Sequence, residues 1–254
     1  MAVTVGIAPE IRSPENAIEW QAAHCFNNGA PATGRVVKAM LGLLASGTQI
    51  GERMAHWPGL TAEHAMPLRL AGGFHNLHLT HADSRLAPIY AGAVTDQAEV
   101  DKIVLAVARQ HDAQLLPWLD GPPQTNEAGR SAGLMAGLLW LAARLGQKLA
   151  TQLELLEIGA SAGANTMLDR FAFDLGGVKA GPPDSPILIR PEWRGPPPPA
   201  SDVQIVSIKG CDQAPVDLTD PAQALRLTSY CWPENHDRLD RLARIVAMAN
   251  ERKP

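Results

Sequence analysis

The sequence has few cysteines, no cluster of basic residues and no long apolar run, and each absence excludes a class of protein. Its three cysteines, Cys25, Cys211 and Cys231, are far apart and form no C-x-x-C pair, so neither a disulfide framework nor a zinc knuckle is indicated. Lys and Arg nowhere form a run, and the formal net charge is −4. The electrostatic signature of a nucleic-acid or anionic-membrane binder is therefore missing, and we expect a small-molecule or protein partner.

The apolar residues indicate a buried core rather than a membrane span. The most apolar stretch, residues 131–146, is shorter than a span and has an arginine near each end. The first ten residues, MAVTVGIAPE, lack the basic and apolar regions of a secretory signal. With 46% hydrophobic and 19% charged residues in 254, we expect a globular cytoplasmic protein.

The first 150 residues have the apolar periodicity of helices. Residues 33–46 place apolar side chains on one face before Gly47, and another helix is expected to begin near Met66. The sequence Asp96-Gln97-Ala98-Glu99 is a capping box, which predicts a helix from Gln97 to about Leu116. Residues 130–145 predict a further helix. We expect residues 1–150 to form a helical N-terminal region.

The pattern changes at Leu153. The run LELLEI (153–158) lies before a glycine turn and predicts a buried parallel strand, and residues 203–208 predict another. Residues 171–173 and 187–189 are expected to pair as a hairpin between them. Helices are expected from Asp220 to about Tyr230 and from about Glu234 to Arg252. Residues 151–254 therefore predict an α/β portion.

The turn after the first predicted strand has two incompatible interpretations. Residues 159–163, GASAG, fit the G-x-S-x-G elbow of a serine esterase, with Ser161 as the nucleophile. An esterase also needs an oxyanion loop and a base, for which the chain offers residues 72–75 (GGFH) and His236. The esterase fold, however, places several strands before its nucleophile, whereas the preceding half of this chain is predicted to be helical.

The same stretch fits a nucleotide-cofactor turn. Glu157 precedes Gly159 and Gly163 in the pattern E-x-G-x-x-x-G, and Asp212 follows the second predicted strand, where an acid accepts ribose hydroxyls. The 49 positions from Gly163 to Asp212 exceed the usual spacing of about 20 residues, and the intervening hairpin and proline loop account for the excess. We expect Glu157 to brace the turn by accepting backbone hydrogen bonds.

This combination, LLEIGASAG followed by GCDQAP, resembles the fold of S-adenosylmethionine-dependent methyltransferases. The resemblance implies a Rossmann-like sheet, S-adenosylmethionine as the cofactor, and methyl transfer to an acceptor that the sequence does not name. It also implies that Gly159, Ser161 and Gly163 form the cofactor turn and that Asp212 binds the ribose. Ser161 stands where the methyltransferase pattern has a glycine.

A second resemblance covers most of the chain. The stretches RLAGGFHNLHL (69–79), PPQTNEAGRSAGL (122–134), PEWRGP (191–196) and GCDQAPVDLTDPAQALRLTSYCWP (210–233) are similar to a bacterial family known as domain of unknown function 2332. Members of that family usually continue for many more residues. The resemblance therefore implies a methyltransferase-type sheet that is incomplete at the C-terminus, and a non-catalytic or truncated scaffold is an alternative to an enzyme.

Four further polar residues are candidates for the cofactor site. Asn126, Glu127 and Arg130 precede the predicted strand in an unusually polar segment, and Asn165 begins the helix after Gly163. Each is also explained as an ordinary capping or loop residue. The histidines at 75, 78 and 81 have helical spacing, but no carboxylate or cysteine completes a ligand set, so we expect no metal site.

Overall fold

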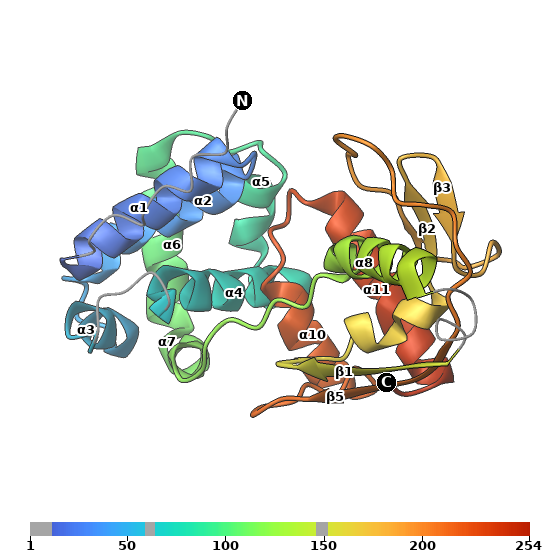
Figure 1. The fold of residues 1–254 in the computed structure, drawn as a ribbon. Coiled ribbons are helices and arrows are strands. Elements are labelled where there is room, and N and C mark those ends of the chain that lie inside the picture. The colour runs from blue at the N-terminus through green and yellow to red at the C-terminus, as the bar shows by residue number, and fades with distance from the viewer. Residues whose placement is uncertain (1–11, 59–63, 146–151) are drawn as a thin grey trace. The chain divides into compact units, whose positions relative to one another are not determined.

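The computed structural model describes residues 12–58, 64–145 and 152–254, which group into two compact units (Figure 1). The first holds the described residues up to Gln124 together with residues 229–236, and the second holds those of 125–228 and 237–254. The boundary expected near residue 150 lies outside the described residues. The architecture is mixed α/β with small sheets, and each unit is described by itself.

The first unit is helical. Its core is formed by apolar side chains that include Ile18, Val36, Leu70, Phe74 and Val104, all fully buried. Its elements are α1 (Pro14–Asn27), α2 (Pro31–Ala39), η1 (Met40–Leu43), α3 (Gln49–Ala55), α4 (Met66–Leu79), η3 (Ser84–Leu86), α5 (Ala87–Tyr90), α6 (Gln97–Gln110), α7 (Asp112–Leu115) and η4 (Leu116–Leu119).

Two of the predicted helices are shorter than expected. The capping box works as predicted in that the Asp96 side chain accepts from the Glu99 amide at 3.0 Å, but α6 ends at Gln110 rather than near Leu116. There the carboxylate of Asp112 accepts from the amides of Gln49 and Ile50 and so caps α3. The helix expected over 33–46 likewise ends at Ala39 and continues as the 3₁₀ turn η1. At the end of α6, the contacts of Asp112 with α3 override the helical periodicity.

Residues 229–236 are bound among the helices by polar contacts. The Glu234 carboxylate accepts from the Thr33 amide at 2.9 Å and the Thr33 hydroxyl at 2.7 Å, which satisfies the start of α2. The Nδ1 atom of His75 lies 3.1 Å from the carbonyl of Ser229. Because a Cβ on Gly72 would lie 2.7 Å from the Tyr230 ring, glycine is needed for this close approach.

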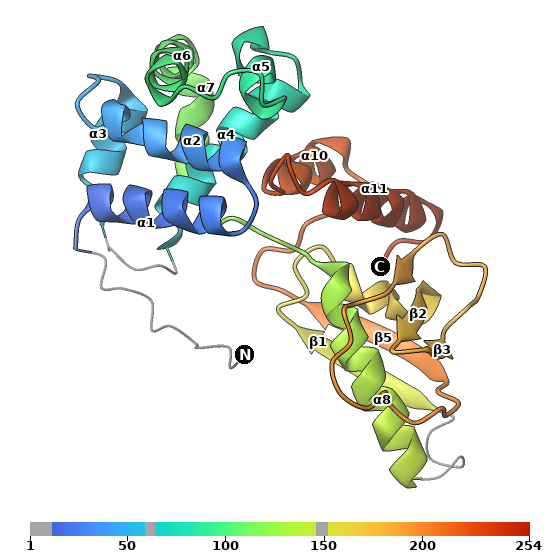
Figure 2. The same ribbon diagram turned by 90° about the horizontal axis from the view of Figure 1, so that it is seen from above.

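The second unit contains two sheets and several helices. Strands β1 (Leu153–Ile158) and β5 (Ile205–Cys211) form a parallel pair, and Figures 1 and 2 show them side by side. A three-stranded sheet has the order β3-β2-β4. The helices are η5 (Ala128–Arg130), α8 (Ser131–Leu145), η6 (Asn165–Arg170), α10 (Pro221–Ser229) and α11 (His236–Glu251). Because the described parallel sheet has two strands, a larger Rossmann-like sheet remains a prediction.

The predicted pairing of residues 171–173 with 187–189 as a hairpin is wrong. Strand β2 (Ala172–Leu175) turns at Gly176-Gly177 and pairs antiparallel with β3 (Val178–Ala180), whereas β4 (Leu188–Ile189) pairs with β2 in parallel. Both glycines have positive φ, of 66° and 96°. A two-residue glycine turn closes a hairpin directly, so the nearer segment takes the antiparallel position.

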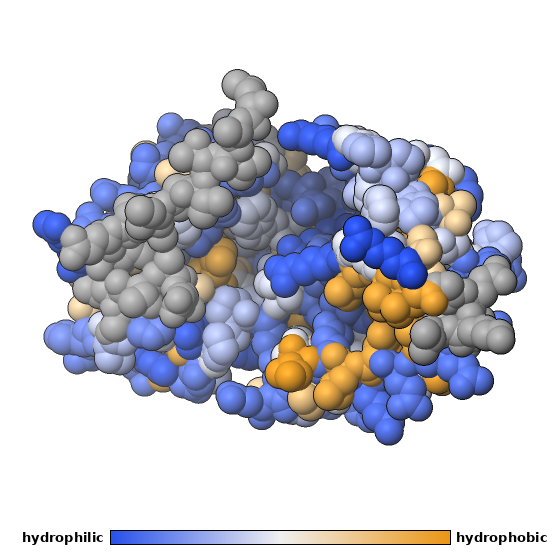
Figure 3. Space-filling view, viewed as in Figure 1, coloured by the Kyte–Doolittle hydropathy of each residue, from blue (hydrophilic) through white to orange (hydrophobic). Residues whose placement is uncertain are grey.

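Strand β1 is also less buried than expected. One of its faces is open to solvent, with Leu156 70% exposed and Ile158 84% exposed. Leu134, Trp140, Leu141 and Leu145 of α8 are exposed as well, and Figure 3 shows apolar surface over α8 and β1. Within the described ranges, no helix is both long enough and apolar enough to cross a membrane.

The helical unit is expected to lose stability in mild acid because of His75. Burial lowers the pKa of this imidazole from 6.5 to about 4, so the fold holds it neutral while the unfolded chain binds a proton more readily. Its stabilising contribution is complete above pH 6.5 and falls by about 3 kcal/mol as the pH drops to 4. Urea unfolding at several pH values measures this slope.

The slope should flatten in His75→Gln, because the amide is still able to donate to the Ser229 carbonyl but does not titrate. The matched control is His56→Gln, which removes an exposed histidine of the same unit and should keep the wild-type slope. An unchanged slope in His75→Gln would contradict this assignment.

Candidate functional site

The candidate site lies where the two parallel strands end. Parallel pairing puts the carboxyl ends of β1 and β5 next to each other, so the turn at residues 159–163 meets the residues that follow Cys211. The amides of Gly159 and Ala160 both donate to the Cys211 carbonyl, at 2.8 and 3.0 Å. The sequence distance between the glycine turn and Asp212 is thus closed by strand pairing.

The turn has three residues in the left-handed region. Gly159, Ser161 and Gly163 have φ values of 76°, 53° and 72°. Glycine adopts this region freely, whereas a residue with a Cβ pays a cost of about 1 kcal/mol or more. The Ser161 backbone is held there from both sides, since its amide donates to Asp212 Oδ2 at 2.8 Å and its carbonyl accepts from Val216 at 3.1 Å.

Asp212 is the brace of this turn. Its Oδ1 atom accepts from the Ala214 amide at 2.8 Å, and its Oδ2 atom accepts from Ser161. The hydrogen bonds from these two backbone amides lower the pKa of the Asp212 carboxyl, and the bond from Ala214 has the largest effect. We expected Glu157 to accept backbone hydrogen bonds and brace the turn; in the structure Asp212 does so.

Glu157 instead forms a buried polar cluster with Asn165. The Asn165 side-chain amide donates to Glu157 Oε1 at 3.2 Å, and burial raises the pKa of the Glu157 carboxyl. Three side-chain oxygens here are buried without a hydrogen-bond partner among the described residues, namely Glu157 Oε2, Asn165 Oδ1 and Ser161 Oγ. Asn165 is only 7% exposed. Buried polar atoms are rarely left unsatisfied, and each of these oxygens is able to accept a hydrogen bond.

A cavity of about 290 Å³ opens beside the turn. Its walls include three of the predicted site residues, Ser161, Gly163 and Asp212, together with Asp217 and Lys253. Its volume is at the lower end of the range for small-molecule sites, about 300–1,000 Å³. Gly159, in the turn itself, and Glu157 and Asn165, on either side of the turn, do not line the cavity.

The three candidates from the preceding polar segment have different positions, and none of them lines the cavity. The Asn126 side chain accepts from the Ala164 amide at 2.7 Å and thereby caps the start of η6. Arg130 lies exposed at the end of η5 and does not line the cavity. Glu127 forms ion pairs with Arg238 at 2.8 Å and Arg241 at 3.2 Å, which anchors the segment to α11.

Among the described residues of the second unit, the lining of the cavity at Ser161 lacks the groups that an esterase would need. Residues 72–75 lie inside α4, where backbone amides are engaged in the helix and do not form an oxyanion loop. The cavity wall includes no histidine from the described residues. What Ser161 shares with a nucleophile elbow is the G-x-S-x-G pattern, its place after a strand and its positive φ.

Two cavity residues were missed by sequence reasoning. Asp217 accepts from the amide and hydroxyl of Thr219 through Oδ1 and from Lys253 Nζ through Oδ2, at 2.6 Å. The sequence around Asp217 indicates a turn only weakly, because Asp-x-Thr is a common turn pattern. No sequence pattern indicates Lys253, since only the path of α11 brings it to the cavity.

Comparison with known proteins gives one match. The family model described as "Uncharacterized protein conserved in bacteria (DUF2332)" matches residues 15–254. The chain belongs to this family. No curated protein and no solved structure matches it significantly. In the described residues of this DUF2332 protein, no three His, Cys, Asp or Glu side chains are grouped to hold a metal ion.

Replacing Asp212 by Asn is expected to lower stability in a pH-dependent way. Because the folded pKa of Asp212 is lowered, its ionised form stabilises the fold above the unfolded value of 3.8, and this contribution is lost as the pH falls through the lower folded value. Urea midpoints should therefore differ between the wild type and Asp212→Asn at pH 7 and converge in acid. The control is Asp202→Asn in an exposed loop, whose urea midpoint should equal that of the wild type at every pH. A difference between Asp212→Asn and the wild type that does not change with pH would contradict the account.

Proposed function

We propose that the second unit binds S-adenosylmethionine, or its demethylated product, at residues 159–163 and supports methyl transfer to an acceptor still to be identified. The observation that carries this proposal is the set of unpartnered buried oxygens of Glu157, Ser161 and Asn165 beside a glycine turn that follows a parallel strand. Glycine turns in this position accept nucleotide cofactors.

The chemistry of the unpartnered oxygens favours a ligand that carries hydrogen-bond donors. A carboxylate and an amide oxygen accept hydrogen bonds, and an ammonium group supplies three donors and no acceptor. The α-ammonium of the cofactor's methionine part is such a group. A positive charge beside Glu157 also favours the ionised carboxylate, which burial alone disfavours.

Asp212 retains capacity to bind a ribose. Each oxygen of an ionised carboxylate has two lone-pair sites, and each oxygen of Asp212 accepts one backbone hydrogen bond in the described structure. The remaining sites suit the two ribose hydroxyls. Asp212 would then hold the turn and the sugar at the same time, and its loss should affect both.

Isothermal titration with S-adenosylhomocysteine tests the proposal. We expect micromolar binding by the wild type and weakening of about tenfold, or about 1.4 kcal/mol, in Glu157→Gln, because the change removes the charge that attracts the ammonium. Glu154→Gln is the matched control: Glu154 lies on the same strand but on its exposed face, so affinity should not change.

Absence of binding by the folded wild type would overturn the cofactor proposal and favour the non-catalytic scaffold. Ser161 as an esterase nucleophile is the second candidate, favoured by its left-handed backbone. Fluorophosphonate labelling that is lost in Ser161→Ala would support it. We expect no labelling, because the Ser161 hydroxyl is buried.

A further inference from the structure

We propose that residues 252–254, which follow α11, form a displaceable plug that divides the candidate ligand cavity. The plug is defined by contacts within the second unit, and its consequence for cofactor binding rests on the function proposed above. Three groups of contacts carry the proposal: the cap at the end of α11, the ion pairs of Arg252 and Lys253, and the walls of two adjoining cavities.

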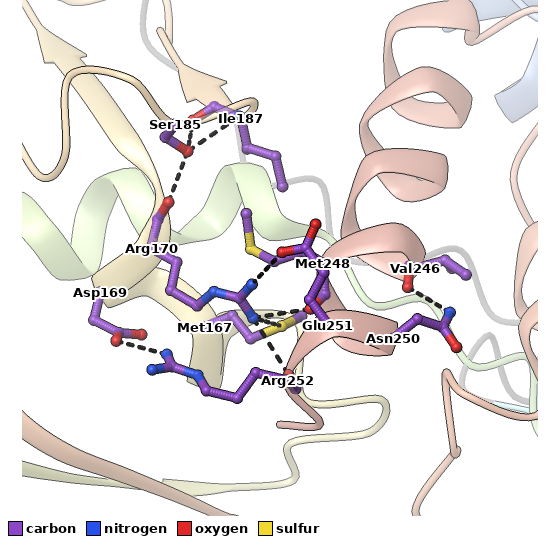
Figure 4. Close-up of polar contacts among 10 residues, drawn as sticks. All are labelled: Met167, Asp169, Arg170, Ser185, Ile187, Val246, Met248, Asn250, Glu251 and Arg252. Atoms are coloured by element: carbon purple, nitrogen blue, oxygen red, sulfur yellow. Dashed lines mark hydrogen bonds and ion pairs between the residues drawn. The ribbon is translucent and has the colours of Figure 1, made fainter.

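Arg170 of η6 sets the direction in which the chain leaves α11 (Figure 4). Its guanidinium donates to the Met248 carbonyl at 2.9 Å and the Arg252 carbonyl at 3.3 Å, and it pairs with Glu251 at 3.2 Å. Arginine at a helix C-terminus satisfies the last carbonyls and complements the helix dipole. With its side chain only 17% exposed, Arg170 is a well-fixed cap.

Beyond the cap, three successive residues contact the surroundings of the glycine turn. Arg252 pairs with Asp169 at 3.0 Å, and Lys253 pairs with Asp217 at 2.6 Å. Pro254 lies against Gly163, where an added Cβ would be 3.0 Å from the proline Cβ. Residues 252–254 thus extend from η6 to the loop after β5.

The plug separates two cavities of similar size. The first, of about 290 Å³, lies at the glycine turn, and the second, of about 280 Å³, lies along β5 at residues 205–209. Both are lined by Thr166, Lys253 and Pro254. Displacing the plug would therefore join them into one site of about twice the volume and give a ligand more room beside the glycine turn.

The contacts that hold the plug are of a kind that a ligand displaces readily. The Arg252 and Lys253 side chains are 64% and 62% exposed, and exposed ion pairs contribute little to stability. The Lys253 ammonium also occupies Oδ2 of Asp217, an acceptor on the cavity wall. A ligand ammonium or hydroxyl group that reaches Asp217 would compete with Lys253 directly.

A thiol placed at the junction of the cavities measures the plug without any ligand. We would introduce Thr166→Cys together with Cys211→Ser, which removes the exposed native thiol and leaves Cys25 and Cys231 buried. The labelling rate with a bulky methanethiosulfonate reagent should rise about fivefold or more when residues 252–254 are deleted, and by a smaller factor in Lys253→Ala. This second, milder variant guards against misfolding of the deletion.

Lys179→Ala is the control, because it breaks a similar exposed pair with Asp174 in the β2–β3 hairpin and should leave the rate unchanged. Equal labelling rates in folded wild-type, Lys253→Ala and deleted chains would overturn the plug. S-adenosylhomocysteine titration of the deleted chain, without the cysteine changes, should show affinity raised about fivefold, as expected when most molecules are initially closed.

The two proposals fail separately. Faster labelling without S-adenosylhomocysteine binding in any variant would support the plug and overturn the cofactor. Binding that is unaffected by the deletion, together with unchanged labelling, would support the cofactor and overturn the plug.

Discussion

The site depends on one carboxylate. Asp212 accepts the Ser161 amide through one oxygen and the Ala214 amide through the other, and so joins the turn after β1 to the turn after β5. Without this brace, the left-handed backbone of Ser161 would lack the hydrogen bond that offsets its cost. Residues of both turns line the cavity.

The buried cluster behind the turn is polar rather than apolar. Glu157, Asn165 and Ser161 each bury an oxygen that has no partner among the described residues, and burial of such atoms costs stability. An apolar packing of the same volume would avoid the cost. Their position at the end of a parallel strand, beside a cavity and beneath a glycine turn, is the physical basis for the ligand proposal.

Local patterns predicted the elements well, and tertiary contacts explain the differences. The strand at 153–158, the cap at Asp96 and the helix after Asp220 follow from residues within one turn of each other. The pairing of β2 with β3 instead of β4, the exposure of Ile158 and the end of α6 depend on residues far apart in sequence.

The same distinction applies to the site. The sequence identified the turn and Asp212, and the proximity of the two follows from parallel pairing. It assigned the bracing role to Glu157 instead of Asp212, because hydrogen-bond partners depend on side-chain direction. It had no means of placing Lys253 and Pro254 at Gly163. The resemblance to the DUF2332 family is confirmed, while the methyltransferase fold and its cofactor stay predictions.

The most direct test of the account is a crystal structure of the protein grown with S-adenosylhomocysteine. We predict ligand density at the glycine turn, with the ribose at Asp212 on the cavity wall and the amino group reaching behind the turn to within hydrogen-bond distance of Glu157 Oε2 or Asn165 Oδ1. An ordered water bridging Glu157 and Asn165, with no ligand in the cavity, would satisfy the same oxygens and would contradict the proposed function.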